Sequence, residues 1–272
     1  MKNVPIHELD KEDYLVIEKI ESGKRINFKE AHCHSFYEIL YFTSINAGDI
    51  HFIDFVEYPI SLDHIYIIHP FQIHEMKLKT QTGYSFALTR EYMHSLHLWP
   101  ESYFDYMMPN DLSFEKHELK CIVKILDLIL YEHQNKHRRE LLDIYAKTLL
   151  TQLILTSKKD SNENYKIDKR VLQLMDLIDK NFVEQRNTDF YARQLYLSGK
   201  RLNELTKKAL GTTIKQLISE RLLLEAKRLI SYGDRTFKEI AFELGFNDSS
   251  YFSRFFKDQS GFSPEQFKSF LS

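Results

Sequence analysis

Four polar residues near the C-terminus recur at the spacing of one helix face and are of the types that contact DNA. Ser250, Ser253, Arg254 and Lys257 lie at i, i+3, i+4 and i+7, which places them on one side of an α-helix. Serines permit close approach, an arginine can donate two hydrogen bonds to the O6 and N7 atoms of guanine, and a lysine can pair with a phosphate. The pattern predicts recognition of bases in the DNA major groove.

The elements around this polar face predict a helix-turn-helix. Gly245 directly follows a shorter helix, where the chain favours a left-handed residue, and Asn247 or Asp248 can cap the next helix with a side-chain oxygen. We expect burial of Ile240, Ala241 and Leu244 on the first helix and of Phe252, Phe255 and Phe256 on the second. An amphipathic hairpin with a solvated polar face would show the same periodicity.

A similar helix-turn-helix pattern occurs fifty residues earlier in the chain. Ser198 can cap a helix that Gly211 ends, as Gly261 ends its counterpart. The expected buried face of this helix is Leu202, Leu205 and Ala209, and its polar face is Lys200, Asn203, Glu204 and Lys207. Two such units joined by one helix predict two DNA-contacting helices on one rigid body.

Residues 171–272 resemble the DNA-binding domain of the AraC/XylS family of bacterial transcription regulators. The signature residues are Ile240-Ala241, Gly245-Phe246, Ser250-Tyr251-Phe252, Arg254, Phe256-Lys257 and Gly261-Phe262-Ser263-Pro264, with Arg221, Leu222, Ala226 and Leu229 in the joining helix. The first unit departs from the family pattern at Thr206, which replaces a usual Phe, and at Glu204, where a base-reading cation or amide is frequent. The resemblance implies seven helices, with the two recognition helices entering successive major-groove segments about 34 Å apart.

The residues expected to contact DNA follow from these two polar faces and the resemblance. They are Lys200, Arg201, Asn203, Glu204 and Lys207 in the first unit, and Ser249, Ser250, Ser253, Arg254 and Lys257 in the second. Promoter or operator DNA is therefore the expected partner, and a regulator of this family can also contact RNA polymerase.

A second group of chemically versatile residues lies near the N-terminus. His32 and His34 are two residues apart, so both would lie on one face of a strand. Glu38, four residues after His34, would lie on that same face, and His74 follows a turn at Pro70. The segments His32-Cys33-His34-Ser35-Phe36-Tyr37-Glu38 and Pro70-Phe71-Gln72-Ile73-His74 resemble the cupin-like sensing domain common in the AraC/XylS family. Metal-binding cupins place such residues around one ion, and this set could hold Zn, Fe, Mn or Ni.

The glycine that usually leads the cupin motif is missing, so we expect these four residues to line an effector cavity without a metal. No cofactor is expected, and a divalent metal at His32, His34, Glu38 and His74 is the alternative. The other histidines show no ligand spacing.

Alternating and helical patterns predict an α+β chain. Short strands are expected at Phe36–Phe42, Ile50–Val56, Ile65–Ile68 and Ser85–Thr89, with turns between them, which favours a barrel or sandwich. Helical apolar stripes at Leu119–Leu130 and Leu141–Ile154 flank a polar turn at His133–Glu140. The two stripes suit a dimer interface, and a monomeric hairpin that caps the barrel is the alternative.

Charge supports a division into domains. Residues 1–165 carry 18 basic and 25 acidic residues, whereas residues 166–272 carry 19 and 14, as expected for a DNA-binding domain behind an acidic one. We expect a cupin-like barrel at 1–112, a dimerisation hairpin at 113–157, a linker at 158–170 and the double helix-turn-helix domain at 171–272.

Neither a signal peptide nor a membrane span is apparent, and two cysteines, Cys33 and Cys121, fit a reducing cytoplasm. The sequence thus predicts a cytoplasmic, dimeric, sequence-specific transcription regulator that is modulated by a small molecule in its barrel and is not an enzyme. The alternative is a metal-dependent cupin enzyme fused to a DNA-binding module.

Overall fold

The computed structural model describes residues 6–10, 13–21, 31–54, 56–76, 80–96, 104, 108–157 and 168–271. Most of these residues divide between an N-terminal unit, at 6–96 and 108–157, and a C-terminal unit, at 168–271. The expected linker, residues 158–170, lies outside the described residues except for its last three. The fold is α+β, as the sequence predicts, with sheets in the first unit and helices throughout the second.

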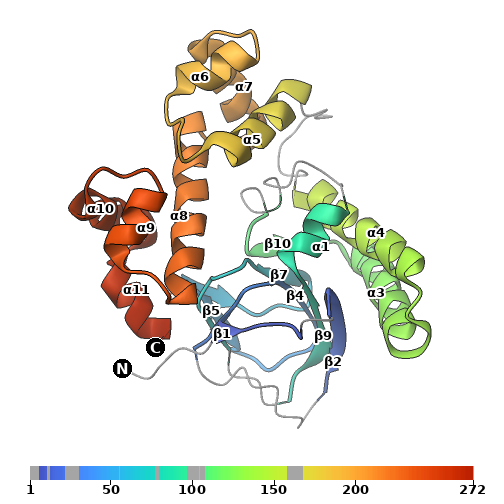
Figure 1. The fold of residues 1–272 in the computed structure, drawn as a ribbon. Coiled ribbons are helices and arrows are strands. Elements are labelled where there is room, and N and C mark those ends of the chain that lie inside the picture. The colour runs from blue at the N-terminus through green and yellow to red at the C-terminus, as the bar shows by residue number, and fades with distance from the viewer. Residues whose placement is uncertain are drawn as a thin grey trace. The chain divides into compact units, whose positions relative to one another are not determined.

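Two antiparallel sheets form the β domain of the N-terminal unit (Figure 1). The five-stranded sheet has the order β10-β7-β4-β9-β2, the three-stranded sheet has the order β6-β5-β8, and β1 pairs with β3 in parallel. The strands are β1 (Ile6–His7), β2 (Leu15–Ile20), β3 (Cys33–His34), β4 (Tyr37–Ser44), β5 (Ile50–Ile53), β6 (Val56–Pro59), β7 (His64–Ile68), β8 (His74–Met76), β9 (Thr82–Leu88) and β10 (Asp111–Ser113).

The central strand of the larger sheet is buried on both faces. All side chains from Tyr37 to Phe42 in β4 are buried, which explains a nearly continuous apolar run where a half-exposed strand would alternate. Side chains from both sheets form one apolar core, which includes Leu40, Phe42, Ile53, Ile68 and Met76. This core holds β4 and β8 in one body, and both strands carry residues of the expected effector site.

One expected strand is in fact a hairpin. The sequence predicts a single strand at Ile50–Val56, but the chain turns at Asp54, whose φ is +44°, and β6 then pairs back onto β5. The Asp54 amide donates to the carbonyl of Ile73 over 2.7 Å, and its carboxylate accepts from the Ile73 amide over 3.0 Å. These bonds stabilise a left-handed conformation that aspartate tolerates better than most residues.

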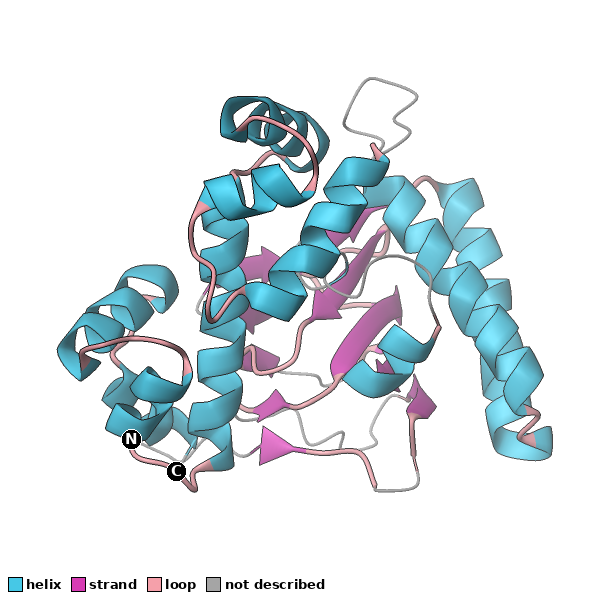
Figure 2. Ribbon diagram, turned by 45° about the horizontal axis from the view of Figure 1, so that its top comes forward, coloured by secondary structure: helices cyan, strands magenta, loops and turns pink. Residues whose placement is uncertain are grey.

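Three α-helices are described beside the strands of the N-terminal unit: α1 (Arg90–Ser95), α3 (Lys116–Tyr131) and α4 (Arg139–Ser157). The helices α3 and α4 form an antiparallel hairpin, the two long neighbouring helices of Figure 2. The predicted apolar stripes are mostly buried, through Leu119, Ile122, Leu126, Ile129 and Leu130 in α3 and Leu142, Leu149, Leu153 and Ile154 in α4. The sequence predicts a polar turn at His133–Glu140, but the first residues of this segment are helical. A π-helical turn (Glu132–Lys136) extends α3, and the chain reverses only at His137, whose φ is +51°.

Seven helices make up the described C-terminal unit, the number that the family resemblance implies. They are α5 (Lys169–Asn181), α6 (Thr188–Gln194), α7 (Gly199–Leu210), α8 (Ile214–Tyr232), α9 (Phe237–Glu243), α10 (Ser249–Ser260) and α11 (Pro264–Leu271). Side-chain oxygens of Asp168, Asn187, Ser198, Thr213, Thr236 and Asp248 cap the first six. Local capping therefore fixes where these six helices start.

The turn between α9 and α10 packs tightly against the loop between α5 and α6. Gly245 has φ +75°, and a Cβ atom there would lie 2.8 Å from the carbonyl oxygen of Val183. The Arg186 guanidinium donates to the carbonyl of Leu244 and lies 4.0 Å from the centroid of the Phe246 ring. This contact attaches the second helix-turn-helix to the first without using the joining helix α8.

Gly245→Ala should destabilise the protein more than Gly261→Ala. Both glycines are left-handed, so alanine costs about 1–2 kcal/mol at either position. Gly261 has no atom within 4 Å of the added methyl group, whereas the Gly245 variant must also displace the Val183 carbonyl. Urea unfolding of both variants measures the difference, and equal losses would contradict the tight contact.

Candidate functional site

Helix α10 presents the predicted polar face to solvent. Ser250, Arg254 and Lys257 are exposed, while Ser249 and Ser253 are partly buried. On the opposite side Phe252 and Phe256 are fully buried, which fixes the rotation of the helix. The carboxylate of Asp248 accepts hydrogen bonds from the amides of Ser250 and Tyr251 over 2.5 and 3.2 Å, so Asp248 is the cap that the sequence left open between two residues.

The cations of α10 are available for an external anion. Within the described part of the chain, neither Arg254 nor Lys257 has an acidic group within ion-pair distance. The Arg254 guanidinium lies 5.9 Å from the centroid of the exposed Tyr251 ring. A guanidinium beside an aromatic ring in the first half of a helix can reach a base edge, and a lysine one turn later can reach a phosphate.

Helix α7 has the same length and caps but different side-chain partners. Arg201 forms an ion pair with Glu204, with 3.2 Å between Nη1 and Oε2. The side-chain oxygen of Asn203 accepts a hydrogen bond from the Ile214 amide over 3.2 Å. Lys200 and Lys207 are exposed. Of the five residues that the sequence assigns to DNA in this unit, three therefore have intramolecular partners, which their spacing could not reveal.

The threonine that departs from the family pattern is accommodated by a local hydrogen bond. Thr206 is fully buried, and its hydroxyl donates to the carbonyl of Leu202 over 2.8 Å. A buried hydroxyl without a partner would be costly, and this bond removes that cost.

The joining helix α8 is fixed to α5 by a charged network. Arg221 is 9% exposed; its Nε donates to Asp179 over 2.9 Å and its Nη1 to Glu225 over 3.1 Å. Glu225 also pairs with Arg228. Burial alone would raise the pKa of Glu225, but the Arg228 and Arg221 guanidinium groups outweigh burial and hold that pKa below its usual value. The network fixes α8, the helix between the two helix-turn-helix units, to α5.

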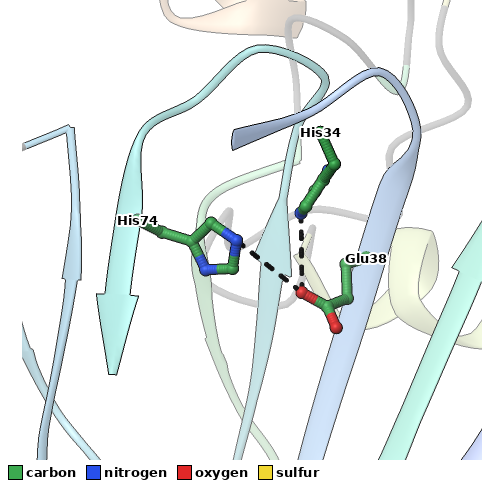
Figure 3. A group of neighbouring side chains, drawn as sticks. All are labelled: His34, Glu38 and His74. Carbon is green, nitrogen blue, oxygen red and sulfur yellow. Dashed lines mark ion pairs between the residues drawn. The ribbon is translucent and has the colours of Figure 1, made fainter. Parts of the chain in front are cut away.

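Three of the four residues predicted for the barrel site converge in the β domain. His34 comes from β3, Glu38 from β4 and His74 from β8, and Figure 3 shows their side chains pointing toward one another. Glu38 Oε2 lies 3.5 Å from His34 Nε2 and 3.9 Å from His74 Nε2. All three residues are buried, and their ligand-type atoms lie within 4.8 Å of one another. Such a set can bind a metal ion or the polar groups of a small molecule.

His32, the fourth predicted residue, is placed differently. Its backbone pairs with that of His74 through hydrogen bonds of 2.9 and 2.8 Å, and its ring centroid lies 4.1 Å from that of His74. Its side chain is outside the group of three converging ligand atoms. His32 therefore packs beside the cluster.

His51 joins the cluster, although its position in the sequence gave no reason to include it. It is fully buried on β5, and its Nε2 lies 3.1 Å from His74 Nδ1. Only the pairing of β5 with β8, in which Ile53 lies opposite His74, brings these two rings together. Strand pairing of this kind cannot be read from residue spacing.

Burial controls the protonation of this cluster. Burial lowers the pKa of His51 to about 4 and that of His74 well below its usual value, so both rings are neutral near pH 7. Burial would raise the pKa of Glu38, but the His34 imidazole and the Ser85 hydroxyl outweigh it and leave that pKa lowered. The cluster thus presents one carboxylate among imidazole rings.

The cluster opens onto a cavity of about 270 Å³. Its polar lining includes His34, Glu38 and Ser85, and its apolar lining includes Val16, Phe36 and Ala87. A cavity with a few converging polar groups on an apolar wall is the usual form of a small-molecule site.

Part of the C-terminal unit matches a known domain family. Residues 191–269 match the family model of a helix-turn-helix domain. The HTH-type transcriptional activator RhaS of Salmonella schwarzengrund (strain CVM19633) is 28% identical over 130 residues, which cover 48% of this chain and 45% of RhaS. The chain thus spans about half the length of the curated relatives it matches.

Solved structures of ToxT from Vibrio cholerae share the fold along almost the whole chain. ToxT from strain O395 has a TM-score of 0.50 at 16% identity, and the match covers 95% of this chain and 97% of ToxT. ToxT bound to (E)-4-(8-methylnaphthalen-1-yl)but-3-enoic acid gives the same TM-score at 15% identity, over 95% and 98% of the two chains. Together with the RhaS relatives, these comparisons show a helix-turn-helix domain at residues 191–269 in a chain that shares the fold of ToxT.

Proposed function

We propose that this protein is a cytoplasmic transcription regulator that binds specific DNA sequences as a dimer and responds to a small molecule held in its β domain. The observation that carries the proposal is the pair of equivalent helices α7 and α10, each capped at its start and ended by a left-handed glycine. Both present exposed lysines from one domain, and α8 joins them. Two such helices can enter successive segments of the major groove.

The distribution of charge supports DNA as the partner of the second unit. Residues 166–272 have a net charge of +5, whereas residues 1–165 have −7. This excess is modest, so affinity depends on where the cations lie and on two helices binding together. Contact with RNA polymerase is part of the same proposal, since a regulator bound at a promoter can act on transcription through the polymerase.

The cavity of the β domain supports a regulatory rather than a catalytic role. It is lined by converging polar side chains, and ToxT, which shares the fold, has been seen with a bound carboxylic acid. An effector that binds one conformation of the regulator more tightly would change its affinity for DNA, and DNA would change the affinity for the effector by the same factor.

Exposed apolar residues on the helical hairpin support dimerisation. Most of the predicted stripes are buried within the chain, but Leu128 and Tyr131 of α3 and Ile144 and Leu155 of α4 are 45–55% exposed. Ile144 and Leu155 are three helical turns apart and share one face of α4. We propose that these four side chains, rather than the whole predicted stripes, contact a second copy of the chain.

Arg254→Ala should weaken binding to the cognate site by about 1–3 kcal/mol and relax discrimination at one base pair. Lys257→Ala should instead weaken binding to all sequences alike and reduce the slope of log K against log salt by about 0.9. Gel-shift or anisotropy titrations on selected and random DNA at several salt concentrations measure both effects. Equal losses on selected and random DNA for Arg254→Ala would remove the base-reading role.

Glu204→Gln should raise affinity for DNA without sharpening specificity. The change removes a negative charge from the DNA-facing side of α7 and releases Arg201 from its ion pair. Arg201→Gln, which removes the partner, is the matched control and should lower affinity. The same DNA titrations measure both variants. A marked loss of cognate binding by Glu204→Gln would show that the carboxylate accepts a hydrogen bond from a base, such as the N4 amino group of cytosine.

Ile144→Glu combined with Leu155→Glu should separate the dimer. Sedimentation of the unaltered protein at micromolar concentration should give twice the 32.5 kDa chain mass, and the double variant should sediment as a monomer. Leu62→Glu changes an exposed apolar residue outside the hairpin and should leave the dimer intact. A monomeric unaltered protein that still binds a two-fold site would rule out this interface.

A further inference from the structure

Three buried atoms in the β domain lie close enough together to share one ion. His34 Nε2 and His74 Nε2 are 3.5 and 3.9 Å from Glu38 Oε2, and they approach that oxygen from two different strands (Figure 3). In zinc sites the metal lies about 2.0–2.2 Å from each nitrogen or oxygen, so neighbouring ligand atoms are about 3–3.5 Å apart. Small side-chain movements would bring the three atoms to that spacing.

Hydrogen bonds at the far nitrogens orient both imidazole rings. His34 Nδ1 lies 2.7 Å from the carbonyl oxygen of Phe36; because a carbonyl only accepts, Nδ1 carries the proton and a neutral ring keeps its lone pair on Nε2. His74 Nδ1 lies 3.1 Å from His51 Nε2. Metal-binding histidines are held in this way, with the second nitrogen bonded to a carbonyl or another polar group.

A hydrogen bond likewise orients the carboxylate of Glu38, which supplies the third atom. Glu38 Oε1 accepts a hydrogen bond from the Ser85 hydroxyl over 2.7 Å, which leaves Oε2 to face the two imidazoles. Within the described part of the chain, neither His34 Nε2 nor Glu38 Oε2 makes a hydrogen bond. Two electron-rich atoms buried at this distance repel each other unless a proton or a cation lies between them. One proton can serve a single nitrogen, whereas one metal ion binds all three atoms.

We propose that the β domain holds a divalent transition-metal ion, with His34 Nε2, Glu38 Oε2 and His74 Nε2 as its protein ligands and His51 as the residue that orients His74. Two nitrogens and one oxygen suit Zn²⁺, Fe²⁺, Co²⁺, Ni²⁺ or Mn²⁺, whereas Ca²⁺ and Mg²⁺ prefer oxygen ligands. The sequence alone favoured a metal-free cavity; the convergence of three oriented atoms reverses that preference.

The same site has room for a further ligand. His34 and Glu38 both line the cavity of about 270 Å³, so a metal with three protein ligands keeps an open side toward that space. A small molecule with an oxygen donor, such as a carboxylate or a hydroxy acid, fits this arrangement. The identification of this molecule with the effector rests on the proposed regulatory function, whereas the metal site itself does not.

Titration of the chelator-treated, full-length protein with Zn²⁺, Co²⁺, Ni²⁺ or Mn²⁺, each alone, tests the site. Calorimetry and elemental analysis after desalting should give one equivalent per chain for at least one of these ions, and the melting temperature should rise by several degrees at saturation. If none of the four ions binds stoichiometrically at micromolar concentration, the proposal is wrong. DNA affinity is measured separately with the Arg254 and Lys257 variants, so either proposal can fail alone.

Single substitutions establish the ligand set. His34→Gln and Glu38→Gln should each abolish stoichiometric binding, and His51→Gln should weaken it about 10–100-fold, as loss of an orienting partner does. His32→Gln is the matched control, because His32 is equally buried beside the cluster but supplies none of the three atoms, and it should keep one equivalent. Retained binding in His34→Gln, or complete loss in His32→Gln, would overturn this assignment. Far-ultraviolet circular dichroism must show that each variant is folded.

Discussion

The buried guanidinium of Arg221 is the interaction on which the geometry of the C-terminal unit depends. It pairs with Asp179 of α5 and with Glu225 of its own helix, and it lies 4.3 Å from the centroid of the Phe182 ring. A buried charge is tolerated only when it is paired and hydrogen-bonded, so α5 and α8 are held in one relative position. Arg186 adds a second attachment, from the loop after α5 to the turn before α10. The proposed binding of α7 and α10 to successive groove segments would need this rigidity, because linked contacts add affinity only when both fit at once.

The two helix-turn-helix units are alike in backbone and unlike in chemistry. Both recognition helices have twelve residues, a side-chain cap and a left-handed terminal glycine. The cations of α10 face solvent without acidic partners among the described residues, whereas in α7 Arg201 pairs with Glu204 and Asn203 binds the start of α8. In the proposed function, this asymmetry would let α10 discriminate between sequences while α7 adds contacts that hold the domain on DNA.

The β domain carries polar groups where a stable core would be apolar. Glu38, His51 and His74 are each at most 3% exposed, and burying such groups costs free energy unless they are fully bonded. Departures from apolar packing of this kind are typical of binding sites rather than of folding cores. A ligand or ion bound there would stabilise the β domain by mass action, and any coupling of that domain to DNA binding would be reciprocal. Under these proposals, the molecule would combine a rigid DNA-binding domain with a β domain that is stabilised by the ligand or ion it binds.

The sequence by itself determined whatever depends on neighbours along the chain. Helix periodicity, caps such as Ser198 and glycines at 245 and 261 predicted the two helix-turn-helix units, the burial of Phe252 and Phe256 in α10 and its exposed cations, because these features depend on residues within one or two turns. The number of seven helices came from the family resemblance. Strand parity likewise placed His34 and Glu38 on one side of the β domain.

Tertiary structure decided what depends on contacts between distant segments. It separated His32 from the converging atoms, brought in His51, gave Asn203 and Arg201 intramolecular partners and divided the strand expected at Ile50–Val56. The register between β5 and β8, and the partners of a long side chain, are fixed by packing across the whole domain. Residue spacing in a single chain does not contain that information.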